Sequence, residues 1–134
     1  PRRYDIVALR ESQIAYMPRG TFARLLDTNF AFNRFLIVQL NERLGQFIAM
    51  VEHDRLRGPE ERLARSLAGL FNPVLYPGIG SSLPVSQEEL GQLVGLSRQR
   101  VNQALKCLEA EGLLRVEYGS VSVLDLARLR TYGE

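Results

Sequence analysis

The segment SRQRVNQALK, residues 97–106, gathers side chains that can bond to the edges of nucleic-acid bases. An arginine can donate to both acceptors of a guanine, and a glutamine or asparagine can pair with an adenine. The segment carries three positive charges and no negative one, which suits a surface that approaches phosphates. Because such residues are common on any protein surface, their meaning depends on the elements that position them.

Helical periodicity divides this segment into an apolar face and a polar face. Ser97 is a helix-capping residue, and Gly112 ends the helix that follows it. The apolar residues, spaced three, one and three apart, are Val101, Ala104, Leu105 and Leu108. The polar residues opposite or beside them are Arg98, Gln99, Arg100, Asn102, Gln103 and Lys106. The pattern predicts that one face is buried and that the other can meet a partner.

A shorter helix precedes this one. Ser86 and Glu89 form a capping box at its start, and Gly95 ends it. Leu90, Leu93 and Val94 supply its buried face. Two short helices joined by a short glycine-containing turn make a helix-turn-helix.

The residues after the second helix predict a wing. Two β-prone runs, 113–117 and 120–124, flank a turn at Tyr118-Gly119. A last short helix is expected from Asp125. The region from residue 58 onward is therefore interpreted as a winged helix-turn-helix.

A long helix is predicted upstream, over about residues 29–56. Its apolar residues at spacings of three and four form the seam of a coiled coil; they are Ile37, Leu40, Leu44, Phe47 and Val51. A second apolar row, which can cover the chain's own domain, consists of Phe32, Phe35, Leu36 and Ile48. A helix of about 27 residues would be about 40 Å long, more than a small domain can cover. The pattern favours a homodimer, and the alternative is one wide stripe buried within a single protomer.

Shorter elements are predicted around the long helix. Two β-prone runs, 5–9 and 13–17, are interpreted as adjacent strands, and two strands alone imply more strands outside this chain. The remaining predictions are a helix over 20–27, a helix from Pro59 to Phe71, and candidate short strands at 74–76 and 82–84 within the loop 72–84. The chain is therefore expected to be a fragment of a longer protein.

The composition limits the chemistry of the 134 residues, which suffice for one compact domain or two small ones. A single cysteine and a single histidine exclude a zinc site, an iron–sulfur cluster and a disulfide within the chain. No catalytic set or phosphate-cradling glycine loop is present, so we expect no enzymatic activity and no cofactor in this chain. The lone cysteine and the lack of an apolar run long enough to span a membrane predict a cytoplasmic protein.

From residue 86 to residue 116 the sequence resembles the DNA-binding domain of the Crp/Fnr superfamily (catabolite activator and fumarate-nitrate reductase regulator). The family's helix opening matches Ser86-Gln87-Glu88, and its turn matches Gly95-Leu96-Ser97-Arg98. Its second-helix pattern matches Val101 to Gly112. The resemblance extends upstream and implies three parts: the last strands of a cyclic-nucleotide-type β-roll (1–28), a dimerisation helix (29–57) and the winged helix-turn-helix (58–134). The expected fold is thus mainly α with a small β component.

The resemblance implies a homodimer that binds an inverted repeat in double-stranded DNA, with RNA polymerase as a further candidate partner. The base-reading positions it assigns are Arg98, Gln99 and Gln103. Gln99 stands where relatives often have Glu, and Gln103 where they often have Arg, so the preferred operator should differ. The residues assigned to phosphate contact are Arg100 and Lys106. The backbone amides of Ser86 and Gln87, at the N-terminus of the first helix, are further candidates for phosphate contact. A winged helix that serves protein–protein contact in a larger regulatory assembly is the alternative hypothesis.

The resemblance also bears on the effector of the intact protein. Arg2 matches the arginine that holds the ligand phosphate in cyclic-nucleotide binders, but Arg3 and Tyr4 differ from the two small residues that follow it there. Phe47 and Ile48 occupy the long-helix positions that meet the purine. Because apolar side chains cannot hydrogen-bond a purine edge, cyclic AMP is disfavoured as the effector.

Overall fold

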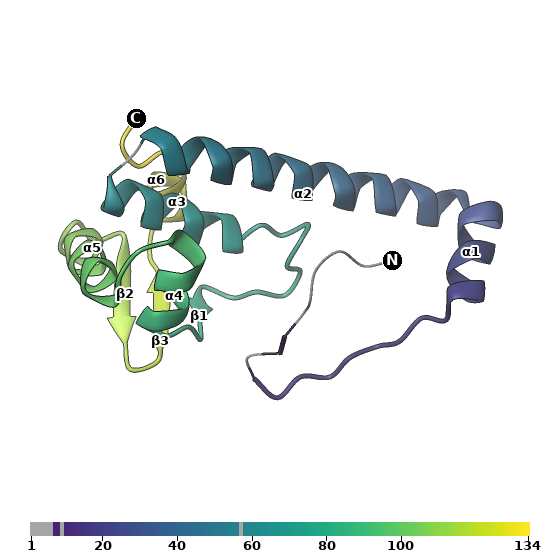
Figure 1. Cartoon of the computed structure of the whole chain (residues 1–134), viewed down its shortest axis with the longest axis horizontal. Coiled ribbons are helices and arrows are strands. Elements are labelled where there is room, and N and C mark those ends of the chain that lie inside the picture. The colour runs from purple at the N-terminus through teal and green to yellow at the C-terminus, as the bar shows by residue number, and fades with distance from the viewer. Residues whose placement is uncertain (1–6, 9, 57) are drawn as a thin grey trace. The chain divides into compact units, whose positions relative to one another are not determined.

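The computed structural model describes residues 7–134 except 9 and 57 (Figure 1). The chain divides into two units, residues 1–37 and 38–134, which are described separately. The long helix α2 (Phe30–Leu56) begins in the first unit and ends in the second. Its bounds agree with the predicted helix over 29–56.

The first unit contains α1 (Arg19–Thr28) and the start of α2. The rings of Phe22 and Phe32 meet edge to face, with centroids 5.6 Å apart. Asn33 Nδ2 donates to the carbonyl of Leu26 at 2.7 Å and joins the two helices. The predicted helix over 20–27 is confirmed.

The strand predicted over 13–17 is wrong, because these residues form no regular structure. The run 5–9 lies mostly outside the described residues, and neither 7 nor 8 is in a strand. A strand exists only where a neighbour accepts its backbone hydrogen bonds. The described part of the chain offers no such neighbour to 13–17, so β propensity alone does not order it as a strand.

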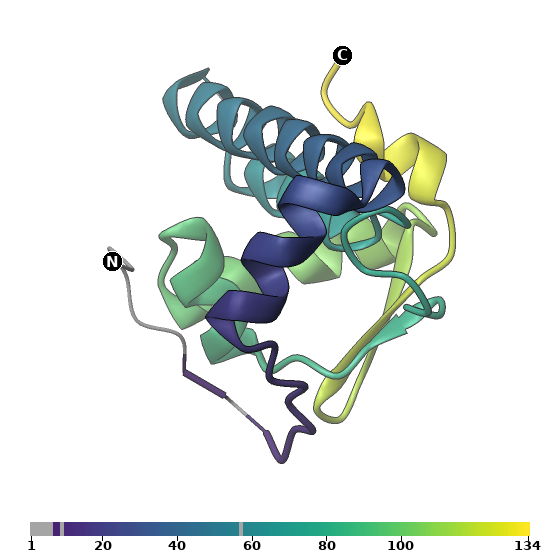
Figure 2. The ribbon, with the colours of Figure 1, turned by 90° about the vertical axis from the view of Figure 1, so that its right-hand side faces the viewer.

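The second unit continues from α2 with α3 (Pro59–Leu70), α4 (Gln87–Val94), α5 (Arg98–Ala110) and α6 (Leu126–Arg130). Its strands are β1 (Ser82–Leu83), β2 (Leu114–Glu117) and β3 (Ser120–Val123), in the antiparallel order β1-β3-β2. The β2–β3 turn lies on the side of the unit away from α6 (Figure 1, Figure 2). This arrangement is the predicted winged helix-turn-helix.

The core of the second unit is apolar and lies where α3 packs on α4, α5 and α6. Buried residues from α3 recur at helical spacing and consist of Leu63, Ala64, Leu67 and Ala68. The wing contributes Leu114, Val121 and Val123, and α6 contributes Leu129. The core therefore contacts α5 only along its apolar face.

The loop between α3 and β1 differs from the prediction in one place. The strand at 82–84 is found as β1, but residues 74–76 form a turn and the strand predicted there is wrong. Asn72 Oδ1 accepts from the amides of Val74 at 2.9 Å and Leu75 at 3.1 Å, which closes the backbone on itself. Leu75 is buried by this turn.

The face of α2 that meets the rest of the second unit is polar. Gln39 Nε2 donates to the carbonyl of Val74 at 2.7 Å, and Gln46 Nε2 donates to that of Gly69 at 3.0 Å. Glu42 Oε2 accepts from Asn72 Nδ2 at 2.9 Å. Ile48, from the second apolar row, does not cover this unit and is exposed. The end of α3 and the following turn present carbonyls and an amide, which need polar partners rather than apolar ones.

Candidate nucleic-acid interface

The outward face of α5 is fixed by the residues behind it. Ser97 Oγ accepts from the amide of Arg100 at 3.4 Å and caps the helix. The predicted apolar row is buried and consists of Val101, Ala104, Leu105 and Leu108. The predicted contact residues on the opposite side are all exposed: Arg98, Gln99, Arg100, Gln103 and Lys106. The helix therefore exposes polar side chains on one face while its opposite face is buried in the core.

A close approach at Gly91 sets the angle between α4 and α5. The amide of Leu96 donates to the carbonyl of Gly91 at 3.0 Å. A Cβ at position 91 would lie 2.7 Å from the carbonyl oxygen of Leu96, so only glycine fits this backbone without a shift. Gly95 ends α4 with φ of 65°, in the left-handed region. Two glycines therefore shape this region. Gly91 of α4 allows the close approach of Leu96, and Gly95 adopts the left-handed conformation that ends α4.

The N-terminus of α4 carries the predicted capping box. Ser86 N donates to Glu89 Oε2 at 2.7 Å, and Glu89 N donates to Ser86 Oγ at 3.2 Å. The Ser86 amide, predicted as a phosphate donor, is therefore occupied by a carboxylate within the chain. The Ser86 hydroxyl retains its hydrogen, because its oxygen acts as the acceptor in the cap. A phosphate contact at Ser86 would use that hydroxyl.

The wing closes a groove against α4 and α5. β2 pairs with β3 in register from Leu114–Val123 to Glu117–Ser120. The wing is tied to α5 because Val116 N donates to Glu109 Oε1 at 2.8 Å. The groove is lined by the start of α4, by Arg98 and by the wing tip, and its polar or charged members include Ser86, Gln87, Glu88, Arg98, Glu117 and Tyr118.

Tyr118 is a candidate contact residue that sequence reasoning did not single out. The sequence marks it only as a turn residue, yet its side chain is completely exposed at the tip of the wing. An aromatic residue next to the glycine of a tight hairpin turn is the signal that could have indicated it. Placed there, its ring and hydroxyl can meet a ligand that lies along the groove.

Charge is distributed unevenly around α5. At about 100° per residue, Arg98, Asn102 and Glu109 lie along the edge that faces the wing, and Arg100 and Cys107 lie along the other. Glu88 and Glu117 also line the groove on the wing side. The outer face and the far edge, with Arg100 and Lys106, therefore form the more positive part of the surface.

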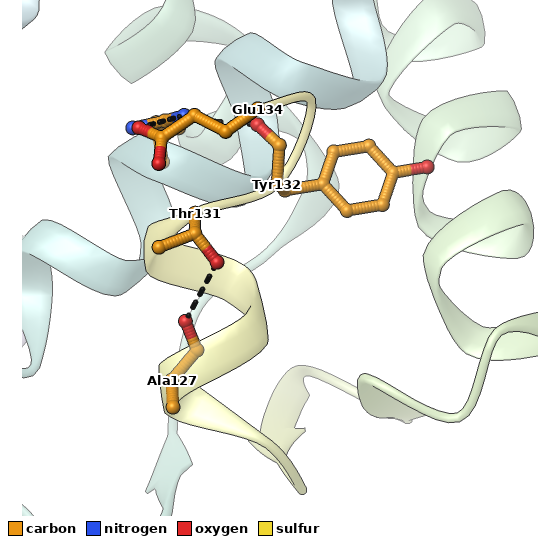
Figure 3. Close-up of polar contacts among 5 residues, drawn as sticks. Ala127, Thr131, Tyr132 and Glu134 are labelled. Atoms are coloured by element: carbon orange, nitrogen blue, oxygen red, sulfur yellow. Dashed lines mark hydrogen bonds and ion pairs between the residues drawn. The ribbon is translucent and has the colours of Figure 1, made fainter.

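The C-terminal end of α5 is held by the last residues of the chain. Tyr132 Oη donates to Glu111 Oε1 at 2.6 Å, and this bond to a carboxylate raises the pKa of Tyr132 to about 12. Arg65 of α3 donates to the Tyr132 carbonyl at 3.2 Å and pairs with Glu134 at 2.8 Å. The Tyr132 hydroxyl points away from Thr131 and Glu134, while Thr131 donates to Ala127 (Figure 3). α3 and α5 are thus joined through the C-terminus.

The predicted dimer seam on α2 is exposed in the single chain. The exposed fractions are 67% for Ile37, 67% for Leu40, 60% for Leu44, 64% for Phe47 and 42% for Val51. None of the described side chains of α2 is buried. The helix therefore offers an apolar face that its own chain leaves uncovered.

The predicted effector positions are Arg2 and, on α2, Phe47 and Ile48. Arg2, the candidate effector residue, lies outside the described residues. Phe47 and Ile48 are 64% and 51% exposed. Among the described residues, no three His, Cys, Asp or Glu side chains are grouped so as to hold a metal ion. No described helix has both the length and the apolar character needed to cross a membrane.

Comparison with known proteins matches the family model of the Crp-like helix-turn-helix domain over residues 61–132. The chain is 28% identical over 119 residues to the cAMP-activated global transcriptional regulator CRP of Haemophilus influenzae, covering 87% of this chain and 52% of that protein. It is 33% identical over 91 residues to the CRP-like protein Clp of Xanthomonas campestris pv. campestris, covering 68% of this chain and 32% of that protein. The chain therefore spans about half or less of the length of these relatives.

The solved structures that are similar to this chain include two transcription regulators. One is a transcriptional regulator of the CRP/FNR family from Thermus thermophilus, with a TM-score of 0.56 and 28% identity, covering 69% of this chain and 48% of that one. The other is the c-di-GMP responsive global regulator CLP of Xanthomonas campestris, with a TM-score of 0.51 and 30% identity, covering 78% of this chain and 54% of that one.

Proposed function

This chain belongs to the Crp/Fnr superfamily of transcription regulators through its Crp-like helix-turn-helix domain, and we propose that it binds double-stranded DNA sequence-specifically as a homodimer. The observation that carries the proposal is the exposed polar face of α5, held between the Ser97 cap and the wing. A recognition helix contacts bases with its N-terminal residues. Arg98 and Gln99 occupy that first turn, and Gln103 follows one turn later.

The phosphate contacts are proposed around this helix. Arg100 and Lys106 are exposed cations that can approach the backbone of the duplex. On the wing side, the Ser86 hydroxyl and the Gln87 amide groups line the groove beside Arg98. Because Glu88 and Glu117 lie there too, neutral donors suit this side better than further cations would.

The homodimer is proposed to form along α2. Burying an exposed Leu, Ile, Val or Phe side chain contributes about 1.5–3 kcal/mol when burial is complete. The five seam residues are 42–67% exposed, so a second α2 that covers them offers at most that share of the gain for each side chain. Two-fold symmetry would place two α5 helices on half-sites about 34–36 Å apart. The operator is therefore proposed to be an inverted repeat.

Phe47 and Ile48 cannot bond to a purine edge, so we propose that the intact protein does not bind cyclic AMP through these positions. Micromolar cyclic AMP binding at this site in calorimetry would contradict that proposal. RNA polymerase is the further partner that a regulator of this kind would meet, and the cytoplasm is its proposed location.

Selection of bound sites from random duplex DNA tests the main proposal. We expect an inverted repeat whose half-sites differ from those read by Glu and Arg at positions 99 and 103. Arg98→Ala should weaken binding by about 1–3 kcal/mol and relax preference at one base position. Affinity should also fall steeply as salt rises. Failure to enrich any sequence, with binding indifferent to Arg98→Ala, would favour a protein-interaction role for the winged helix.

A further inference from the structure

A hydrogen bond joins the two helices of the helix-turn-helix near the start of both. Asn102 Nδ2 donates to Gln87 Oε1 at 3.3 Å, and both side chains are half-buried. Asn102 lies on the wing-side edge of α5, one turn after Arg98. Gln87 is the first residue of α4 and lines the groove that also contains Arg98. The bond therefore connects a recognition-helix residue with a candidate phosphate contact.

The direction of this bond decides what Gln87 can offer to a ligand. A primary amide has an acceptor oxygen on one side and a donor NH2 on the other. Because Asn102 occupies the oxygen of Gln87, the Nε2 group of Gln87 is left for other partners. A phosphate only accepts hydrogen bonds, so it would be attracted by Nε2 and repelled by Oε1. The reverse orientation of the same side chain would oppose binding.

We propose that Asn102 is a positioning residue, which orients the Gln87 amide so that its NH2 group can donate to a DNA phosphate. The inference rests on the proposed DNA-binding function and adds a residue to it. Asn102 acts through Gln87 and does not itself read a base. Its contribution is therefore independent of DNA sequence.

The side-chain chemistry at position 102 predicts the order of DNA affinity among variants at this position. Alanine removes the donor and leaves the Gln87 amide free to turn. Aspartate can only accept, so it would attract the NH2 group of Gln87 and turn the oxygen outward, and its charge would also repel the phosphate. Glutamine keeps a donor amide on a longer stem. The expected order of affinity is wild type, then Asn102→Gln, then Asn102→Ala, then Asn102→Asp.

A double-mutant cycle tests the proposal on the 134-residue chain. Fluorescence anisotropy with a random-sequence duplex at low salt would compare wild type, Gln87→Ala, Asn102→Ala and the double variant. We expect each single variant to weaken binding roughly 2–10-fold, the effect of one hydrogen bond. The double variant should bind no more weakly than Gln87→Ala alone, because Asn102 acts only through Gln87. Melting curves would confirm that every variant is folded.

Arg100→Ala provides the matched control, because Arg100 lies on the opposite edge of α5. Its effect should multiply with that of Gln87→Ala. If Asn102→Ala behaves in the same multiplicative way, or if it alters the base preference in selected sites, the positioning role is wrong while the DNA-binding function stands. If the wild-type chain does not bind the duplex at all, both the function and this inference are overturned.

Discussion

The helices α2 and α5 use apolar residues in opposite ways. α5 buries its apolar row completely against α3 and the wing, and exposes only polar side chains at the start of its outer face. α2 exposes large apolar residues and uses Gln39, Glu42 and Gln46 to meet its own unit. The same helical periodicity thus serves an internal core in one helix and an uncovered surface in the other. Apolar spacing alone does not tell which of the two a helix will be.

The largest expected effect follows from charging the uncovered face. Ile37→Glu with Leu44→Glu should give monomers in sedimentation equilibrium, because two buried carboxylates would face their symmetry mates without partners. Helix content should be largely retained, since neither side chain joins the core. Ile37→Leu with Leu44→Ile is the control and should remain dimeric. A persistent dimer in the charged variant would place the interface elsewhere.

The next largest effect is the difference in unfolding free energy between truncating a leucine of α5 and truncating one of α2. Leu105 of α5 is 1% exposed and Leu40 of α2 is 67% exposed. Leu105→Ala should lower the free energy of unfolding by about 2–5 kcal/mol through a core cavity. Leu40→Ala, measured on the monomeric background, should change it by less than about 0.5 kcal/mol. Similar losses in denaturant melts would mean that α2 is packed in solution within one chain.

Replacing Gly91 of α4 and Gly45 of α2 by alanine should give a smaller difference in stability. Gly91→Ala would place a Cβ against the Leu96 carbonyl, and the clash of about 1–3 kcal/mol should exceed the helix-propensity gain of about 0.5–1 kcal/mol. A Cβ added at Gly45 of α2 would meet no other atom within 4 Å, so Gly45→Ala should gain that propensity term alone. Thermal melts should therefore shift in opposite directions. A stabilising Gly91→Ala would show that the turn can open at little cost.

The smallest effect concerns pH at the end of α5. Folding raises the pKa of Tyr132 from 10.0 to about 12. The stability linked to this bond is therefore complete below pH 10 and is lost as pH rises towards 12. Absorbance titration of tyrosinate should show one late component that Tyr132→Phe removes. The unfolding free energy of that variant should also depend less on pH in this window.

Local signals predicted the helix-turn-helix well. Ser86 with Glu89 marks the start of α4, Gly95 its end, Ser97 the start of α5 and Asp125 that of α6. Each is a cap or turn that acts within a few residues of the chain, so the sequence contains both partners. The wing is predictable for the same reason, since its two strands flank a turn at Tyr118-Gly119.

Predictions that depended on neighbours distant in the sequence were partly wrong. The run 13–17 has strand propensity but no neighbouring strand among the described residues, and residues 74–76 are closed by Asn72 instead of pairing. The second apolar row of α2 was interpreted as a face that can cover its own domain. Phe32 of this row packs on Phe22 of α1, but Ile48 is exposed and polar residues make the contacts to the second unit. In each case the propensity of the segment does not show whether a partner strand or an apolar surface lies beside it.

The sequence by itself determined which segments form helices, where they begin and end, and which side chains of α5 remain outside. These properties arise from caps, glycines and periodicity, whose interactions are local. Only the tertiary structure decided that a Cβ at Gly91 would meet the Leu96 carbonyl, and that Asn102 bonds to Gln87. Such contacts depend on distances and directions between packed elements, and these are fixed only when the core brings α3, α4, α5 and the wing together.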